Sequence, residues 1–149
     1  MTQSRIRARY GLGIWGLVGA AFASVFFLGG GAATYANDSM RKLAAATILA
    51  AGFAGYLGMI YLTREKADGK VLIRDERDLE IARQANEVAL VAVLVFVFAV
   101  CIALFLGYET AGSLPVGWMW FLAYATACFG LLAQSAATLA LHSQMSGNG

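Results

Sequence analysis

The stretch "VALVAVLVFVFAVCIALFLG", residues 88–107, decides the fold class of this chain. Its 20 residues include no Asp, Glu, Lys or Arg. An α-helix needs about 20 consecutive apolar residues to cross a hydrocarbon core of about 30 Å. Inside that core the backbone must satisfy its own hydrogen bonds, which a helix does within a single segment. The stretch therefore predicts a membrane-spanning helix.

Three more segments of the same kind lie around it. They are "GLGIWGLVGAAFASVFFLGG" from Gly11, "LAAATILAAGFAGYLGMIYL" from Leu43 and "LPVGWMWFLAYATACFGLLAQSAATLAL" from Leu114. Hydrophobic residues make up 60% of the 149 residues and charged residues 13%, against about 25% charged in soluble domains. In water, a chain of this length would expose large apolar patches. We therefore predict one domain, residues 1–149, forming an all-α integral membrane four-helix bundle with spans at about residues 11–31, 43–62, 88–107 and 115–140.

The first segment also allows a second interpretation. Arg5, Arg7 and Arg9 precede it and small residues follow at positions 31–33, as in a secretory signal peptide. Its apolar run reaches about 20 residues, whereas the core of a signal peptide has about 7 to 15, and nothing like a soluble mature domain follows. A membrane span is the prediction, and cleavage of this segment is the alternative.

Basic residues are distributed unevenly between the two sides of such a bundle. The N-terminal arm and the loop of residues 63–87 lie on one side and carry three and six basic residues, whereas the other side carries only Arg41 and Lys42. Because positively charged loops stay in the cytoplasm, we expect both termini to be cytoplasmic in a prokaryotic inner membrane. Tyr108 and Trp118 fall at the expected outer edge, where aromatic rings collect. The three arginines of the arm are suited to anionic lipid headgroups.

A run of charged residues leads directly into the third span. In "RDERDLEIARQANE", residues 74–87, opposite charges recur three or four positions apart, as in Arg83 with Glu87. Such pairs stabilise an exposed helix by about 0.2 to 0.5 kcal/mol each. Asp75 has the side chain of an N-cap, so a helix that begins there can continue to Gly107. We therefore predict that the third helix extends into the cytoplasm beyond the lipid.

The leading hypothesis is that this extension binds or regulates a protein partner without catalysing a reaction. The expected interaction surface is Asp75, Glu76, Arg77, Asp78, Leu79, Ala82, Arg83 and Asn86. The loop of residues 63–87 has six basic and seven acidic residues, so it lacks the net positive charge that nucleic acid requires. Its carboxylates allow a metal-dependent membrane enzyme as a weaker alternative, but the single histidine, His142, lies far away in the sequence. We expect no metal and no cofactor.

An oligomeric pore or a small-molecule carrier is a further alternative. Counting in sevens from Leu79 gives Asn86 and Val93, a heptad stripe that fits a homo-oligomer seam or an ordinary packing face within one chain. No predicted span has an ionisable residue at mid-depth, which proton-coupled transport normally requires.

The fourth span has a polar inner half. Its members are Gln134, Ser135 and Thr138, followed by His142. Hydrogen bonding between helices accounts for such residues in lipid. The alternative is a shallow polar pocket that opens to the cytoplasm and is closed by His142 and Asn86.

Small residues four apart allow helix backbones to approach closely. We expect packing faces at Gly16, Ala20 and Ser24 in the first span, and at Ala46, Ala50, Ala54 and Gly58 in the second. Cys101 and Cys128 fall at different depths, so we expect two free thiols.

The segment "RDERDLEIARQA", residues 74–85, resembles part of a family of small uncharacterised prokaryotic four-span membrane proteins. In that family an Asp-Glu-Arg triplet, here residues 75–77, and a later Ile-x-x-x-Ala, here Ile81 and Ala85, precede the third span. The resemblance implies the four-span architecture and carries no activity.

Overall fold

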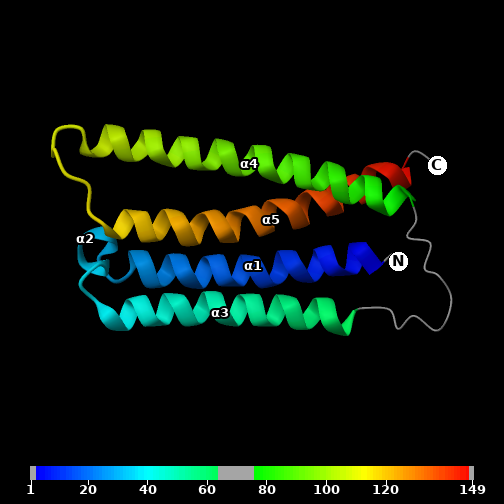
Figure 1. Ribbon diagram of the computed structural model, residues 1–149, viewed down its shortest axis with the longest axis horizontal. Helices are drawn as coiled ribbons and strands as arrows, with labels where there is room; N and C mark the ends of the chain where they lie inside the picture. The colour runs from blue at the N-terminus through cyan, green and yellow to red at the C-terminus, as the bar shows by residue number, and fades with distance from the viewer. Residues whose placement is uncertain (1–2, 64–75, 148–149) are drawn as a thin grey trace.

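The computed structural model describes residues 3–63 and 76–147. The helices within these ranges are α1 (Gln3–Phe27), α2 (Gly31–Tyr35), α3 (Ser39–Leu62), α4 (Glu76–Tyr108) and α5 (Gly117–Gly147) (Figure 1). All of them except the short α2 are long and apolar enough to cross a membrane. The prediction of an all-α chain with four long apolar helices is therefore confirmed.

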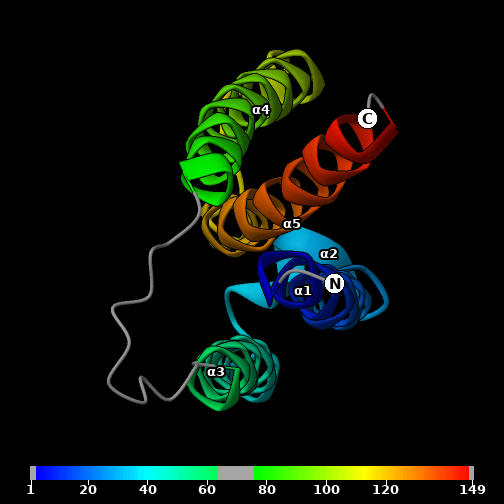
Figure 2. The same ribbon diagram turned by 90° about the vertical axis from the view of Figure 1, so that its right-hand side faces the viewer.

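The four long helices lie side by side in a curved row, in the order α4, α5, α1 and α3 (Figure 2). In this row α1 packs against α3 and α5, and α4 packs mainly against α5. Neighbours along the row run in opposite directions, so both termini lie at the end where α4 begins (Figure 1). We call this the N-terminal end, and the opposite end, which holds α2, the α2 end. The row is an open form of the predicted bundle, with α3 and α4 at its edges.

The core follows an aromatic face of α1. Trp15, Phe22 and Phe26 recur at helical spacing, and all three are buried. The ring centroid of Phe26 lies 4.9 Å from that of Phe121 on α5, and the centroid of Trp15 lies 4.9 Å from that of Phe53 on α3. Close packing of aromatic rings supplies van der Waals attraction between neighbouring helices. α1 thus holds one neighbour on each side.

The small residues that allow close approach differ from those expected in the second span. Ala45 and Gly52 are the buried residues of α3. A Cβ added to Gly52 would lie 2.7 Å from Val18 Cγ2 on α1, so a larger residue would force Val18 to shift. Of the expected stripe, Ala46, Ala50 and Ala54 are exposed instead, and Gly58 is half-buried. The large aromatic rings of α1 determine which face of α3 turns inward. The spacing of small residues along α3 does not contain that information.

The first helix ends at the glycine run. α1 ends at Phe27, earlier than the predicted span, and Gly30 and Gly31 have φ values of 99° and 67°. Glycine adopts this left-handed conformation without the penalty of a Cβ. The chain then forms α2, which lies against the start of α5, where a Cβ on Gly117 would collide with the backbone of Ala32.

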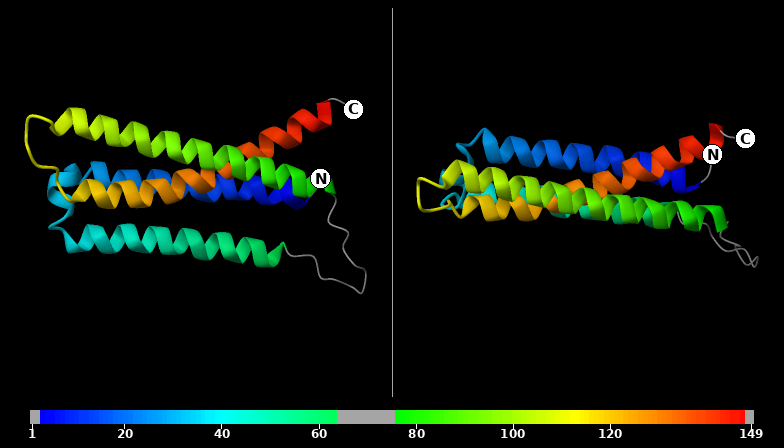
Figure 3. Two further views of the ribbon diagram at one scale, coloured as in Figure 1. Left: turned by 45° about the horizontal axis from the view of Figure 1, so that its top comes forward. Right: turned by 90° about the horizontal axis from the view of Figure 1, so that it is seen from above.

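α4 and α5 cross and diverge on both sides of the crossing, as Figure 3 shows. Along their contact the ring centroids of Phe96 and Phe129 are 4.6 Å apart in a stacked pair. α4 is continuous over 33 residues, or about 50 Å at 1.5 Å per residue, which exceeds a hydrocarbon core of about 30 Å. Its predicted N-cap, Asp75, lies outside the described residues.

Candidate functional site

Three polar side chains meet at the N-terminal end, one each from α1, α4 and α5. His142 Nε2 lies 2.7 Å from Ser4 Oγ and 4.0 Å from Asp78 Oδ1. Ser4 Oγ lies 3.4 Å from the same oxygen of Asp78. The His142 side chain is 9% exposed and that of Asp78 is 26% exposed. We call this group the Ser4–Asp78–His142 cluster.

The cluster has the residue types of a catalytic triad but a different arrangement. In a triad the carboxylate holds one ring nitrogen of the histidine while the other nitrogen takes the serine proton. Here Ser4 and Asp78 both approach Nε2, so the carboxylate does not orient the ring toward the serine. The hydroxyl has one proton and donates it to either His142 or Asp78 at a time. The arrangement therefore forms a hydrogen-bonded junction between three helices rather than an activated nucleophile.

A second contact joins α1 to α3 at the same end. Arg7 Nε donates to Thr63 Oγ1 at 2.8 Å, and Arg7 Nη2 donates to the Thr63 carbonyl at 2.6 Å. Thr63 is the C-cap of α3, and the last carbonyls of a helix lack partners within it. Of the three arginines expected at lipid headgroups, Arg7 is thus engaged within the chain, Arg5 is half-buried and Arg9 is exposed.

The polar residues of α5 lie in different surroundings. Gln134 Nε2 donates to Asn86 Oδ1 on α4 at 2.7 Å, and both residues line a cavity of about 370 Å³ between the two helices. Ser135 and Thr138 instead donate to carbonyls of their own helix, and His142 belongs to the cluster described above. Interhelical hydrogen bonding is therefore observed at Asn86 and Gln134.

The expected interaction surface divides between two sides of α4. Asp78 turns toward α1 and α5, and Asn86 bonds to α5. Leu79 and Arg83 are exposed, and Ala82 is half-buried. The backbone of Glu76 and Arg77 forms the first turn of α4, and Asp75 lies outside the described residues. Asn86 and Val93 of the heptad stripe lie beside α5 of the same chain. This placement matches the interpretation of the stripe as a packing face within one chain.

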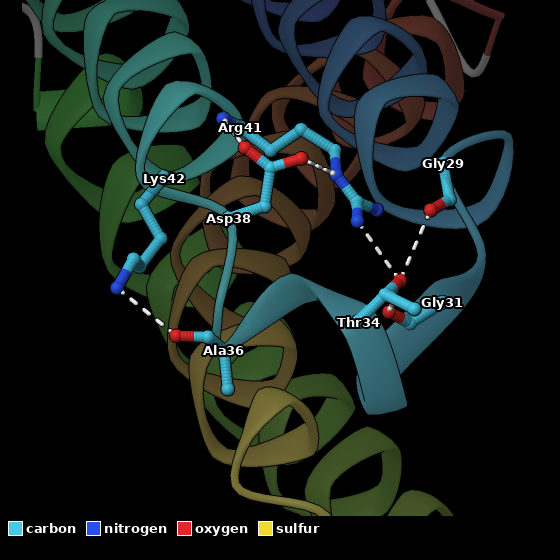
Figure 4. A network of polar contacts seen from close by, with 7 residues as sticks. All are labelled: Gly29, Gly31, Thr34, Ala36, Asp38, Arg41 and Lys42. Atoms are coloured by element: carbon cyan, nitrogen blue, oxygen red, sulfur yellow. Dashed lines mark hydrogen bonds and ion pairs between the residues drawn. The ribbon is translucent and has the colours of Figure 1, made fainter.

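A separate polar network joins α2 to α3 at the α2 end (Figure 4). Asp38 caps α3 by accepting from the backbone N–H of Arg41 at 3.1 Å, and it also accepts from Arg41 Nε at 2.7 Å. Arg41 Nη2 donates to Thr34 Oγ1 at 2.8 Å, and Lys42 Nζ donates to the carbonyl of Ala36 at 3.0 Å. The hydrogen bonds from Arg41 hold the pKa of Asp38 below its usual range. Both basic residues of this end are thus engaged in the turn.

A larger cavity, of about 820 Å³, lies between α4 and α5 toward the α2 end. Its lining is mostly apolar and includes Val97, Cys101, Leu104, Met119, Leu122 and Ala123. At its rim, Trp118 Nε1 donates to Tyr108 Oη at 2.8 Å, and Glu109 contributes a carboxylate. Sequence reasoning missed this cavity, because its walls come from two spans; the aromatic residues at the expected outer edge were the available signal. We call it the α4–α5 cavity.

No family model, curated protein or solved structure matches this chain. The resemblance of residues 74–85 to a four-span membrane family stays a prediction. Within residues 3–63 and 76–147, no group of three or more His, Cys, Asp or Glu side chains is placed to hold a metal ion.

Proposed function

We propose that this chain is a non-enzymatic multi-pass protein of a prokaryotic inner membrane, and that it binds or regulates a protein partner through one face of α4. That face consists of Leu79, Glu80, Arg83 and Glu87, and we call it the exposed α4 face. The four long apolar helices support a membrane location. The nine basic residues on one side, three in the arm and six in the loop, favour cytoplasmic termini.

The observation that carries the proposal is the way the start of α4 is docked. Ile81 and Ala85 on its inner side are each 1% exposed, and Asp78 contacts Ser4. Leu79 on the other side is a large apolar residue that is 45% exposed. Because one side of the helix is fixed, the opposite side is presented in a set orientation. A preordered surface reduces the entropy that a partner must lose on binding.

The charges on this face indicate the chemistry of the partner. Arg83 Nε lies 3.2 Å from Glu87 Oε1, and the two side chains are 72% and 65% exposed. An ion pair this exposed contributes at most about 1 kcal/mol, so a partner's charges can replace it. The face fits an amphipathic helix that places an apolar residue against Leu79 and a carboxylate against Arg83. The apolar contact would supply affinity, and the charges would set specificity.

Charge reversal at Arg83 tests the proposal. Tagged full-length wild type, Arg83→Glu and Arg9→Glu are purified from membranes in mild detergent, and the captured proteins are quantified by mass spectrometry. Arg9 is exposed on α1 at the same end of the row, so its reversal is the matched control. We expect one partner to be retained by wild type and Arg9→Glu and reduced about tenfold or more with Arg83→Glu, since like charges repel across an interface. Equal capture by all three chains would contradict the proposal.

The orientation has its own test. A C-terminal alkaline phosphatase fusion should be inactive and a C-terminal fluorescent protein fusion should fluoresce, because the first needs export and the second folds in the cytoplasm. An active phosphatase would refute cytoplasmic termini.

A further inference from the structure

The α4–α5 cavity runs from one end of the row toward its middle. At 1.5 Å per residue, its lining extends about 16 Å along α4, from Tyr108 to Val97, and about 12 Å along α5, from Trp118 to Thr126. This is about half of a hydrocarbon core of about 30 Å. Given the membrane location and orientation proposed above, on which this inference rests, the walls face the outer half of the bilayer. The rim then lies at headgroup depth.

The rim of the α4–α5 cavity carries one negative charge and one hydrogen-bond donor that is free to bind a ligand. Glu109 is the charged residue among those that line the cavity, and no other described residue forms an ion pair with it. The basic side chains at the same end, Arg41 and Lys42, are engaged in the network between α2 and α3. Tyr108 accepts a hydrogen bond from Trp118, so its own O–H proton remains available to an acceptor.

These features match an amphiphile that carries an ammonium group, a phosphate and a long apolar chain. An ammonium pairs with the carboxylate of Glu109 and can also lie against the aromatic faces at the rim. A phosphate oxygen accepts from the Tyr108 hydroxyl, and an acyl chain covers the apolar walls. We propose that the α4–α5 cavity binds one aminophospholipid of the phosphatidylethanolamine type.

The depth of the charge favours a membrane lipid over a free lipophilic cation. A cation bound deep between apolar walls requires a compensating charge at that depth. Among the residues that line the cavity, the carboxylate lies at the rim instead, next to Tyr108 at the end of α4. An aminophospholipid carries its amine at this level while its chain fills the interior.

The test measures which lipids stay with the protein. Full-length wild type, Glu109→Gln and Glu87→Gln are placed in nanodiscs of equal parts phosphatidylethanolamine and phosphatidylglycerol, released into mild detergent, and their retained lipids are counted by native mass spectrometry. Glu87→Gln neutralises an exposed acid on the same helix but at the opposite end of the row. We expect phosphatidylethanolamine to be enriched about two- to fivefold in wild type and Glu87→Gln, the range that one exposed charge pair supplies. The enrichment should disappear with Glu109→Gln.

A second measurement locates the lipid. The Trp120→Phe variant keeps two tryptophans. Trp118 lies at the cavity rim, and Trp15 is fully buried. Phosphatidylethanolamine with brominated acyl chains should quench the remaining fluorescence more strongly than brominated phosphatidylglycerol at the same mole fraction. Equal quenching by the two lipids would contradict the assignment.

Other occupants give distinct results that overturn the proposal. Unenriched phosphatidylethanolamine in wild type, or enrichment that survives Glu109→Gln, excludes the headgroup contact. Glu109-dependent binding of tetraphenylphosphonium in nanodiscs without phosphatidylethanolamine identifies a free cation as the ligand. A Cys101 disulfide between two copies in membranes identifies a second chain on this surface, since Cys101 lines the cavity and is exposed. Capture of the partner by Arg83 variants is scored separately, so either proposal can fail alone.

Discussion

Replacing Gly117 by alanine should separate α2 from the start of α5. The added Cβ would lie 2.8 Å from Cα and 2.9 Å from the carbonyl carbon of Ala32, whereas ordinary contacts are 3.4–4 Å. The two backbones must therefore move apart by about 0.5 Å or more, because backbone atoms cannot rotate away as a side chain can. Overpacking of this kind costs about 1–3 kcal/mol. The shift also reaches the core, since Tyr35 of α2 packs 5.2 Å from Phe26 between ring centroids.

Gly107→Ala is the matched control. Gly107 lies within α4, and a Cβ added there meets nothing within 4 Å. Alanine is favoured over glycine in a helix by up to about 1 kcal/mol, so this variant should be as stable as wild type or slightly more stable. Unfolding is followed by tryptophan fluorescence and circular dichroism during titration with sodium dodecyl sulfate in mixed micelles. The reasoning fails if Gly117→Ala unfolds at the same detergent fraction as Gly107→Ala.

Three further outcomes follow from the contacts described. A double-mutant cycle of Asn86→Leu and Gln134→Leu in the same unfolding assay should give a coupling of about 0.6 kcal/mol, and additive effects would deny their hydrogen bond. In mild detergent without phosphatidylethanolamine, Cys101 should react with a maleimide faster than Cys128, because the first thiol is exposed and the second is buried; equal labelling in mass spectra of the peptides would contradict this. Asp38→Asn should destabilise the protein at neutral pH. The pKa of Asp38 is lowered in the folded wild type, so the stability that its ionised carboxylate contributes is present above about pH 4. That stability is lost as the pH falls through the folded-state pKa. The difference in melting temperature between wild type and Asp38→Asn should therefore shrink as the pH is lowered. A constant difference from pH 6 to pH 2 would disprove the reasoning.

The long helices could be predicted because each one depends on a local run of residues. About 20 apolar residues specify a long helix whatever its neighbours are, and the apolar run of residues 88–107 lies within α4. The order of the helices in the row could not be predicted in this way. It depends on the rotation of each helix, which the fit between the rings of α1 and the small residues Ala45 and Gly52 decides.

The candidate site was predicted only in fragments. Asp78 was assigned to a partner surface and His142 to a polar pocket, and Ser4 was assigned to neither. The structure joins them across sequence separations of 74 and 138 positions, and no periodicity within one helix encodes such a contact. The pair of Asn86 and Gln134 was closer to prediction, because both residues belong to the polar pocket that the sequence offered as an alternative, and polar side chains next to apolar spans need hydrogen-bond partners.

The position of α1 and α5 at the centre of the row has a consequence for biosynthesis. The aromatic face of α1 is made early, but its partners on α5, Trp118, Phe121 and Tyr124, are made after α2, α3 and α4. Until α5 arrives, α1 has only α3 and α2 beside it, and α4 lacks its principal neighbour. Given the membrane location proposed above, a ribosome that stalls beyond α4 would leave α1 packed against α3 but α4 without its principal neighbour. In such a chain the rings of Phe22 and Phe26, which the aromatic residues of α5 cover in the finished protein, would remain uncovered on that side.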